Sequence, residues 1–299
     1  MPEPVLYFNR YTQQIETEAI YGEGFVRWAY ENPLGKLTTA LFIKRAFFSK
    51  WYGWRMNRPV SREKIAPFLA QYQVSTDEMK EAPESFAHFN AFFCRKLKPS
   101  ARPIATEPGS VVFPADGRHF VIPDLAANDG IFVKGIRFDL TALLRDAELA
   151  KKFKHGSMII SRLCPVDYHR FHFPCDGTPG APKFINDSLF SVSPIALRQH
   201  PTLLWENKRC LTRFQTAGLG EVLLLEVGAT CVGTIVHTHA SGQPVQKGDE
   251  KGYFLFGGSC FITLFEEGKV KLADDLLQQS AEGRETYARM GDVAGYVVG

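Results

Sequence analysis

The sequence predicts an α+β protein in which a helical N-terminal extension, residues 1–105, precedes a β-rich, sandwich- or barrel-like domain, residues 106–299. Two observations support this prediction. In residues 62–73 and 76–98, apolar side chains recur at spacings of three and four, which is typical of amphipathic helices. From Ser110 onward, short apolar runs alternate with glycine and proline, which is typical of strands and turns.

Five short apolar runs are the strongest strand candidates in the second part of the chain. They are GIFVKGIRF, SMIISRLC, EVLLLEVG, CVGTIVHTH and YFLFGGSCFITLFE, at residues 130–138, 157–164, 221–228, 231–239 and 253–266. One helix, DLTALLRDAELAKKF at 139–153, is expected to interrupt these strands.

Composition sets the cellular context that we expect. With 299 residues and 45% hydrophobic content, the chain can bury a large core. The six cysteines have no regular spacing, and the N-terminus lacks the layout of a secretory signal, so we expect a reducing cytoplasm. Acidic residues near the start argue against a mitochondrial transit peptide, and no run approaches the roughly 20 apolar residues needed to cross a bilayer.

A glycine-glycine-serine segment near the C-terminus is a candidate for chemistry on the chain itself. Residues 247–261 read KGDEKGYFLFGGSCF, so Ser259 follows Gly257 and Gly258. Glycine lacks a Cβ atom, which leaves the carbonyl of Gly258 open to attack by a neighbouring hydroxyl. The same composition also forms ordinary turns, so the segment needs partners before it indicates a reaction.

Two other segments can supply those partners. VVFPADGRHF breaks an apolar run at Pro-Ala-Asp-Gly and places Asp116 at a turn. SRLCPVDYHRFHFPCDG places His169 and His172 three residues apart among aromatic side chains. A serine becomes a nucleophile when an imidazole takes its proton, and a carboxylate orients that imidazole. Asp116, His172 and Ser259 can supply these three parts.

Four blocks of the sequence resemble the phosphatidylserine decarboxylase family. They are PADGR, DYHRFHFP, VGATCVGTI and KGDEKGYFLFGGS, at residues 114–118, 167–174, 227–235 and 247–259, in the family's order. Carried over residue by residue, the resemblance matches Asp116, His172 and Ser259 to the family's self-processing triad. It matches His169 to the histidine that is linked to decarboxylation. Cys260 departs from the pattern, because a hydroxyl residue commonly follows the reactive serine.

The resemblance implies a proenzyme that cuts its own chain between Gly258 and Ser259. The products would be a β chain, residues 1–258, and an α chain, residues 259–299, on which Ser259 has become a covalent pyruvoyl group. Such a keto group accepts the electron pair that decarboxylation leaves on Cα, a task for which ordinary side chains are not suited. The implied reaction converts phosphatidylserine to phosphatidylethanolamine and carbon dioxide, without a dissociable cofactor or a metal.

Residues 32–62 carry seven basic side chains and no acidic one, interleaved with aromatic and aliphatic residues. This composition favours an anionic membrane surface, although part of the apolar stripe can instead pack on the rest of the protein. Together with the implied lipid substrate, it predicts a peripheral membrane protein on the cytoplasmic face of a bacterial cell membrane. A homodimer remains open, and no feature indicates nucleic acid.

Three other interpretations fit parts of the sequence. A serine hydrolase could use Asp116, His172 and Ser259, but the segment lacks the second glycine of a G-x-S-x-G elbow. A metal site could be built from six residues, but no HExxH or paired CxxC element accompanies them. These six are Cys164, His169, His172, Cys175, His237 and His239. A non-catalytic membrane-binding module is the third alternative.

Overall fold

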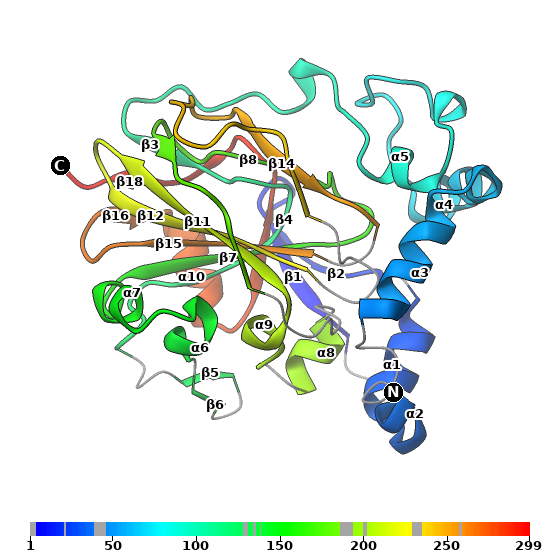
Figure 1. Cartoon of the computed structure of the whole chain (residues 1–299), viewed down its shortest axis with the longest axis horizontal. Coiled ribbons are helices and arrows are strands. Elements are labelled where there is room, and N and C mark those ends of the chain that lie inside the picture. The colour runs from blue at the N-terminus through cyan, green and yellow to red at the C-terminus, as the bar shows by residue number, and fades with distance from the viewer. Residues whose placement is uncertain are drawn as a thin grey trace.

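The chain folds into a β-rich body with helices along one side (Figure 1). The computed structural model describes residues 4–20, 22–38, 46–127, 131–133, 136–137, 139–185, 194–199, 202–228, 235–256 and 259–299. The helices on this side are α1 (Glu23–Glu31), α2 (Pro33–Thr38), α3 (Ala46–Met56), α4 (Ile65–Tyr72) and α5 (Phe89–Phe93), with 3₁₀ turns at Pro59–Lys64, Pro83–Ser85 and Pro99–Ala101. This arrangement confirms the predicted α+β class.

A ten-stranded sheet forms the centre of the body, in the order β10-β11-β12-β15-β7-β4-β17-β1-β2, with β9 paired to β11. Its strands are β1 (Leu6–Asn9), β2 (Gln14–Thr17), β4 (Gly117–Ile122), β7 (Ser157–Leu163), β9 (Thr178–Pro179), β10 (Lys183–Ile185), β11 (Arg209–Thr216), β12 (Gly220–Val227), β15 (Ser259–Phe265) and β17 (Glu285–Ala288). β15 is central, because it pairs with β12 on one side and β7 on the other.

The first two strands add an unexpected N-terminal edge to this sheet. β1 pairs in parallel with β17, and β2 folds back on β1 as a hairpin. Arg10, just after β1, adds two hydrogen bonds to the carboxylate of Asp275, at 2.6 and 2.7 Å. The beginning and the end of the chain are therefore joined through one edge of the large sheet.

Smaller sheets pack beside the large one. β8 (Arg170–His172), β13 (Ile235–His237) and β14 (Glu250–Phe254) form the order β13-β14-β8, and β3 (Ser110–Val112), β16 (Val270–Leu272) and β18 (Val293–Val297) form the order β16-β18-β3. β5 (Ile131–Val133) pairs with β6 (Ile136–Arg137). The remaining helices are α6 (Leu140–Leu144), α7 (Ala147–Lys152), α8 (Pro194–Gln199), α9 (Leu203–Glu206) and α10 (Asp274–Ala281).

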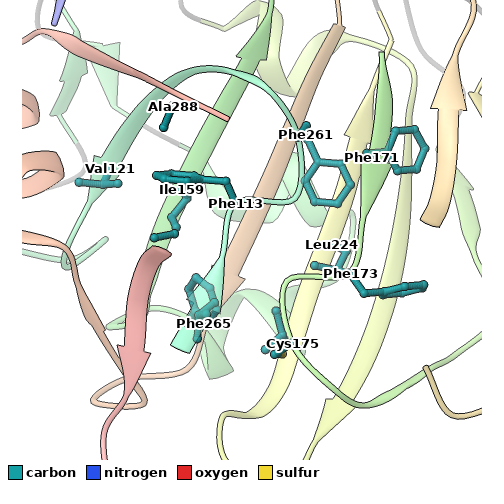
Figure 2. Packing of buried hydrophobic residues seen from close by; sticks show 14 of the residues in the cluster. Phe113, Val121, Ile159, Phe171, Phe173, Cys175, Leu224, Phe261, Phe265 and Ala288 are labelled. Atoms are coloured by element: carbon teal, nitrogen blue, oxygen red, sulfur yellow. The ribbon is translucent and has the colours of Figure 1, made fainter. Parts of the chain in front are cut away.

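Both faces of β15 are buried. Phe261 and Phe265 point into a core that also contains Phe171 of β8 and Leu224 of β12, as Figure 2 shows. Alternate residues of β15, among them Ile262, face a second core that is covered by α6 and α7. A strand covered on both faces reads as a continuous apolar run, which explains why residues 259–265 are recognisable as a strand from sequence.

Two predicted helices are shorter in the structure. The segment 139–153 forms α6 and α7, because Arg145 adopts a left-handed conformation (φ 51°) and ends the first helix. Asp146 then caps the second helix through the amide of Leu149. In residues 76–98, only Pro83–Ser85 and α5 are helical, and the phenylalanines of α5 pack into a buried apolar cluster with Met56, Ile65 and Phe68.

Candidate active site

Ser259 is the first residue of the central strand β15 and pairs with Leu163 of β7. Its side chain is fully buried, and its Oγ atom has no hydrogen-bond partner among the described residues. Buried hydroxyls normally find a partner, so an orphaned one needs a functional explanation. Gly257 and Gly258, which precede Ser259, lie outside the described residues.

Phe256, on the other side of these two glycines, is anchored to the helical part of the chain. Its amide donates to Oδ1 of Asn90 at 2.8 Å. Its ring packs edge-on against Phe89 and Phe93 of α5, with centroids 5.0 and 4.9 Å away. The residues that flank the predicted cleavage site are thus held by two different parts of the fold, α5 before it and the large sheet after it.

His172 ends β8, in the small sheet β13-β14-β8. Its backbone amide donates to the carbonyl of Pro114 at 2.7 Å, which attaches this strand to the PADGR turn. Its Nδ1 atom is buried and has no partner in the described structure. Burial lowers the pKa of His172 from 6.5 to about 4, so the ring is neutral at physiological pH and can accept a proton.

Asp116 lies in the turn between β3 and β4, two residues after Pro114. Its carboxylate accepts hydrogen bonds from Arg102, at 2.6 to 3.0 Å, and from the amide of Met290 at 2.9 Å. A Cβ atom at Gly117 would lie 2.6 Å from the carbonyl oxygen of Arg162, so glycine lets this turn approach β7 closely.

Among the described residues, no hydrogen bond connects Asp116, His172 and Ser259 to one another. Against the larger effect of burial, the negative charges of Glu250 and, to a smaller extent, Asp116 raise the pKa of His172, and the Asp116 carboxylate is bonded to Arg102. Ser259 and His172 come from facing strands, as the contact between Phe171 and Phe261 shows, with ring centroids 5.5 Å apart (Figure 2). Catalytic hydrogen bonds are often incomplete in resting structures, so the arrangement is compatible with a base and a nucleophile.

His169 has a defined tautomer. Its Nδ1 atom lies 3.0 Å from the carbonyl oxygen of Asp167, and because a carbonyl only accepts, Nδ1 carries the proton. Nε2 is therefore unprotonated, and it is buried without a partner in the described part of the chain. The ring packs at a tilt of 35° against Phe93, with centroids 3.8 Å apart. Burial lowers the pKa of His169 to about 3.

Asp167, the first residue of the DYHRFHFP block, contacts His169 and is not among the candidate residues predicted from the sequence. Arg118 holds its two carboxylate oxygens at 2.8 and 2.7 Å, and the amide of Cys164 donates to one of them at 2.6 Å. Arg95 donates to its backbone carbonyl at 3.4 Å. These contacts fix the carbonyl that orients His169. In the sequence, the available signal is an acidic residue two positions before His169, and its burial is visible only in the structure.

The residues weighed as metal ligands do not gather as a set. Among the described residues, one group of three has ligand atoms within 4.8 Å of one another: Cys210, Glu226 and His237. Of the six weighed from sequence, this group contains His237. His169 and His172 instead take the backbone contacts described above.

The N-terminal helices expose aromatic and basic side chains. Trp51 and Trp54 of α3 are 42% and 56% exposed, and the guanidinium groups of Arg55 and Arg58 lie over their rings. Residues 39–45 of the same basic segment lie outside the described residues. In the part of the chain that is described, no helix combines the length and the apolar content needed to span a bilayer.

Comparison with known proteins decides the family. The family model described as Phosphatidylserine decarboxylase matches residues 89–295. The chain belongs to this family. It is 42% identical over 291 residues to the phosphatidylserine decarboxylase proenzyme of Clostridium kluyveri, covering 97% of this chain and 98% of that protein. Proteins with the same description from Fusobacterium nucleatum, 41% identical and covering 98% of both chains, and Chlamydia pneumoniae, 42% identical and covering 97% and 96%, are similarly alike.

The matched segment of this phosphatidylserine decarboxylase family member contains all four candidate side chains, Asp116, His169, His172 and Ser259. It also contains α5, which packs against His169 and anchors Phe256. The resemblance noticed in four short blocks therefore extends over nearly the whole chain.

Proposed function

We propose that this protein is a phosphatidylserine decarboxylase that cuts itself between Gly258 and Ser259 and carries a pyruvoyl group derived from Ser259. The observation that supports it most directly is the buried hydroxyl of Ser259, which has no hydrogen-bond partner among the described residues and faces the strand of a neutral histidine. General-base activation requires an available hydroxyl and an unprotonated imidazole, and this chain carries one of each on strands that pack against each other through Phe261 and Phe171.

Self-processing begins with proton transfer from Ser259 to His172. The serine oxygen attacks the carbonyl carbon of Gly258, and the peptide nitrogen leaves with a proton, so that an ester replaces the amide. Loss of the Cα proton of Ser259 then expels the carboxylate of Gly258. Water replaces the nitrogen of residue 259, which departs as ammonia. Glu250 and Asp116 supply the negative charges near His172 that stabilise the protonated ring.

The pyruvoyl group supplies an electron-accepting carbonyl for the pair left on Cα when carbon dioxide departs. His169 is the residue that we assign to proton delivery at that carbon. Its Nδ1 atom is committed to Asp167, so Nε2 is the ring atom that can take up and deliver a proton. Its low pKa favours release of that proton once it has been taken up.

The fold explains how the α chain can stay in place after cleavage. β15 begins at Ser259 and pairs with β7 from Ser259 to Phe265 and with β12 from Cys260 to Leu264. β17 of the same fragment pairs with β4 and with β1. Breaking the bond before Ser259 therefore removes one covalent link while both strands remain within the sheet.

We assign this enzyme to the membrane surface as a peripheral protein, on the cytoplasmic side. The exposed Trp51 and Trp54 can enter the interface, and the neighbouring Arg55 and Arg58 can attract anionic lipid. Such contact would bring the enzyme to phosphatidylserine, which resides in the bilayer.

Intact-mass analysis tests the proposal. The wild-type protein should give two chains, residues 1–258 and 259–299, with the second one carrying a pyruvoyl group in place of its serine. Ser259→Ala should remain a single inactive chain, and the matched control Ser241→Ala, at an exposed turn, should cut normally. Borohydride reduction with phosphatidylserine present should attach the lipid amine to the 259–299 chain. A wild-type protein that stays uncut would instead favour the serine hydrolase.

A further inference from the structure

A buried ionic cluster joins the two sheets that carry Ser259 and His172. The ammonium of Lys251, on β14, lies 2.6 Å from Oε1 of Glu226, on β12, and 3.0 Å from the hydroxyl of Thr212, on β11. The other carboxylate oxygen of Glu226 lies 3.1 Å from Nε2 of His237. Lys251 and Glu226 are both completely buried. None of these residues takes part in the proposed reaction.

Lys251 lies at an irregularity in the ladder between β14 and β8. Glu250 pairs with His172 and Gly252 pairs with Phe171, so two steps along β14 correspond to one step along β8. Lys251 is the additional residue of this β-bulge. Bulges redirect a side chain and are common next to active sites. Here the redirected side chain is a lysine beside the strand position of the proposed base.

Stability alone does not account for a charge pair at this position. The pair lies beside an aromatic core, and the ammonium is 5.8 Å from the ring centroid of Phe171. Removing two charges from water costs several kcal/mol per ion, and apolar pairs of similar volume are often as stable or more stable. What an ion pair adds over an apolar contact is a defined distance and direction between its two strands.

Glu226 lies next to the strand of Ser259, and Lys251 lies next to the strand of His172. Glu226 pairs with Phe261 of β15, two residues from Ser259 on the same face of the strand. Lys251 lies on β14 at the step between the partners of His172 and Phe171. We propose that Lys251 and Glu226 are positioning residues: an ionic tie between the sheets that sets the strand of His172 against the strand of Ser259. This role rests on the proposed self-processing reaction.

The cluster also contains the three potential metal ligands, Cys210, Glu226 and His237. Lys251 already occupies one oxygen of Glu226, and its positive charge opposes a second cation there. Burial raises the pKa of the Cys210 thiol to about 12, which keeps it protonated. These contacts favour an ionic tie over a metal site.

Four variants, one of them the single substitution Lys251→Met, separate positioning from stability. Lys251→Met with Glu226→Leu replaces the tie by an apolar pair, and we expect a melting temperature within a few degrees of wild type but self-cleavage at least tenfold slower, since misplacement by about 1 Å can cost a hundredfold in rate. Glu226→Gln keeps the shape of the site and should also slow the cut. Lys251→Arg should restore part of the rate lost in Lys251→Met. Lys269→Met, at an exposed turn, is the matched control.

The assay follows newly synthesised protein by intact mass, with and without EDTA or added zinc. If the folded variants cut at the wild-type rate, the proposal that Lys251 and Glu226 are positioning residues is wrong. If the cleavage rate of the wild-type protein changes with zinc or EDTA, a metal site at this cluster is the better interpretation. Amide hydrogen exchange supplies a second measurement in the uncut Ser259→Ala background. There the double variant and Glu226→Gln should exchange faster over residues 170–172, and unchanged exchange would contradict the proposal. If wild-type protein never cuts, the proposed function fails and exchange alone decides.

Discussion

The pH dependence of self-cleavage tests whether the buried His172 is the base. Because burial lowers its pKa to about 4, the ring should remain neutral far below the ordinary histidine range. At pH 5.5, a base with a pKa of about 4 is about 97% unprotonated, whereas one at the ordinary 6.5 is only about 9% unprotonated. The two cases therefore differ by roughly tenfold in cleavage rate at one accessible pH.

The measurement is a pH jump. Uncut protein from cell-free synthesis is transferred to buffers between pH 8 and pH 4, and the fraction cut is followed by intact mass. The rate should stay nearly constant down to about pH 5 and fall by half near pH 4. A midpoint near 6.5 would refute the reasoning, because it would place the catalytic base in a solvated environment.

Unfolding in acid would also lower the cleavage rate, so it must be distinguished from protonation of His172. The folded-state pKa of His172 lies below its unfolded value, so the unfolded chain binds more protons and stability falls as pH falls from about 6.5 toward 4. His119 and His169 add to the same loss, since burial lowers the pKa of each to about 3. The free energy of unfolding of the uncut Ser259→Ala variant, measured by urea titration, defines the pH range in which cleavage rates report chemistry.

Three further predictions concern residues around the site and the surface. His169→Ala should still cut but release no carbon dioxide from phosphatidylserine, as scored by mass and by gas release. Asp167→Asn should lower the free energy of unfolding by about 3 to 5 kcal/mol in urea titration, because it leaves the buried guanidinium of Arg118 without its full counter-charge. Replacing Trp51 or Trp54 by serine should weaken sedimentation with anionic vesicles roughly tenfold, since partial burial of such a ring contributes about 1.5 kcal/mol.

Each of these has a control. Full activity of His169→Ala would show a merely structural histidine. Adding Arg118→Met to Asp167→Asn should recover part of the lost stability, and no recovery would argue against the ion pair as its cause. Phe184 is 52% exposed on β10, so Phe184→Ser should leave vesicle binding unchanged if the tryptophans act through the helical surface.

Local sequence patterns predicted those elements whose own residues show by their apolar character which faces are buried. β15 is apolar on both faces, so its run is legible without knowledge of its neighbours. The Pro-Ala-Asp-Gly segment after an apolar run correctly predicted the turn that contains Asp116. The pairing of β1 with β17 was not predictable in this way, because four-residue strands from opposite ends of the chain carry no local sign of their partner.

The features that were not predicted depend on contacts between residues far apart in the sequence. Asp167 stands two residues before His169 in the sequence, but the contact that fixes its carboxylate comes from Arg118, on another strand. Lys251 reads as one more charged residue in KGDEKGYF, and its burial appears only when the bulge turns it toward Glu226. A lysine at a strand position is usually exposed, so composition gave the opposite expectation.

The division of the proposed site between two sheets links processing to completed folding. Ser259 begins a central strand of the large sheet, whereas His172 ends a strand of the small one, so their separation is defined only after the two sheets have packed. The segment before the cut is held separately, by the contact of Phe256 with α5. A partly folded chain would lack at least one of these three supports. Self-cleavage should therefore appear after the core has formed rather than during synthesis of the final strands, and the Lys251–Glu226 contact between the sheets is where that order can be disturbed without touching a reacting group.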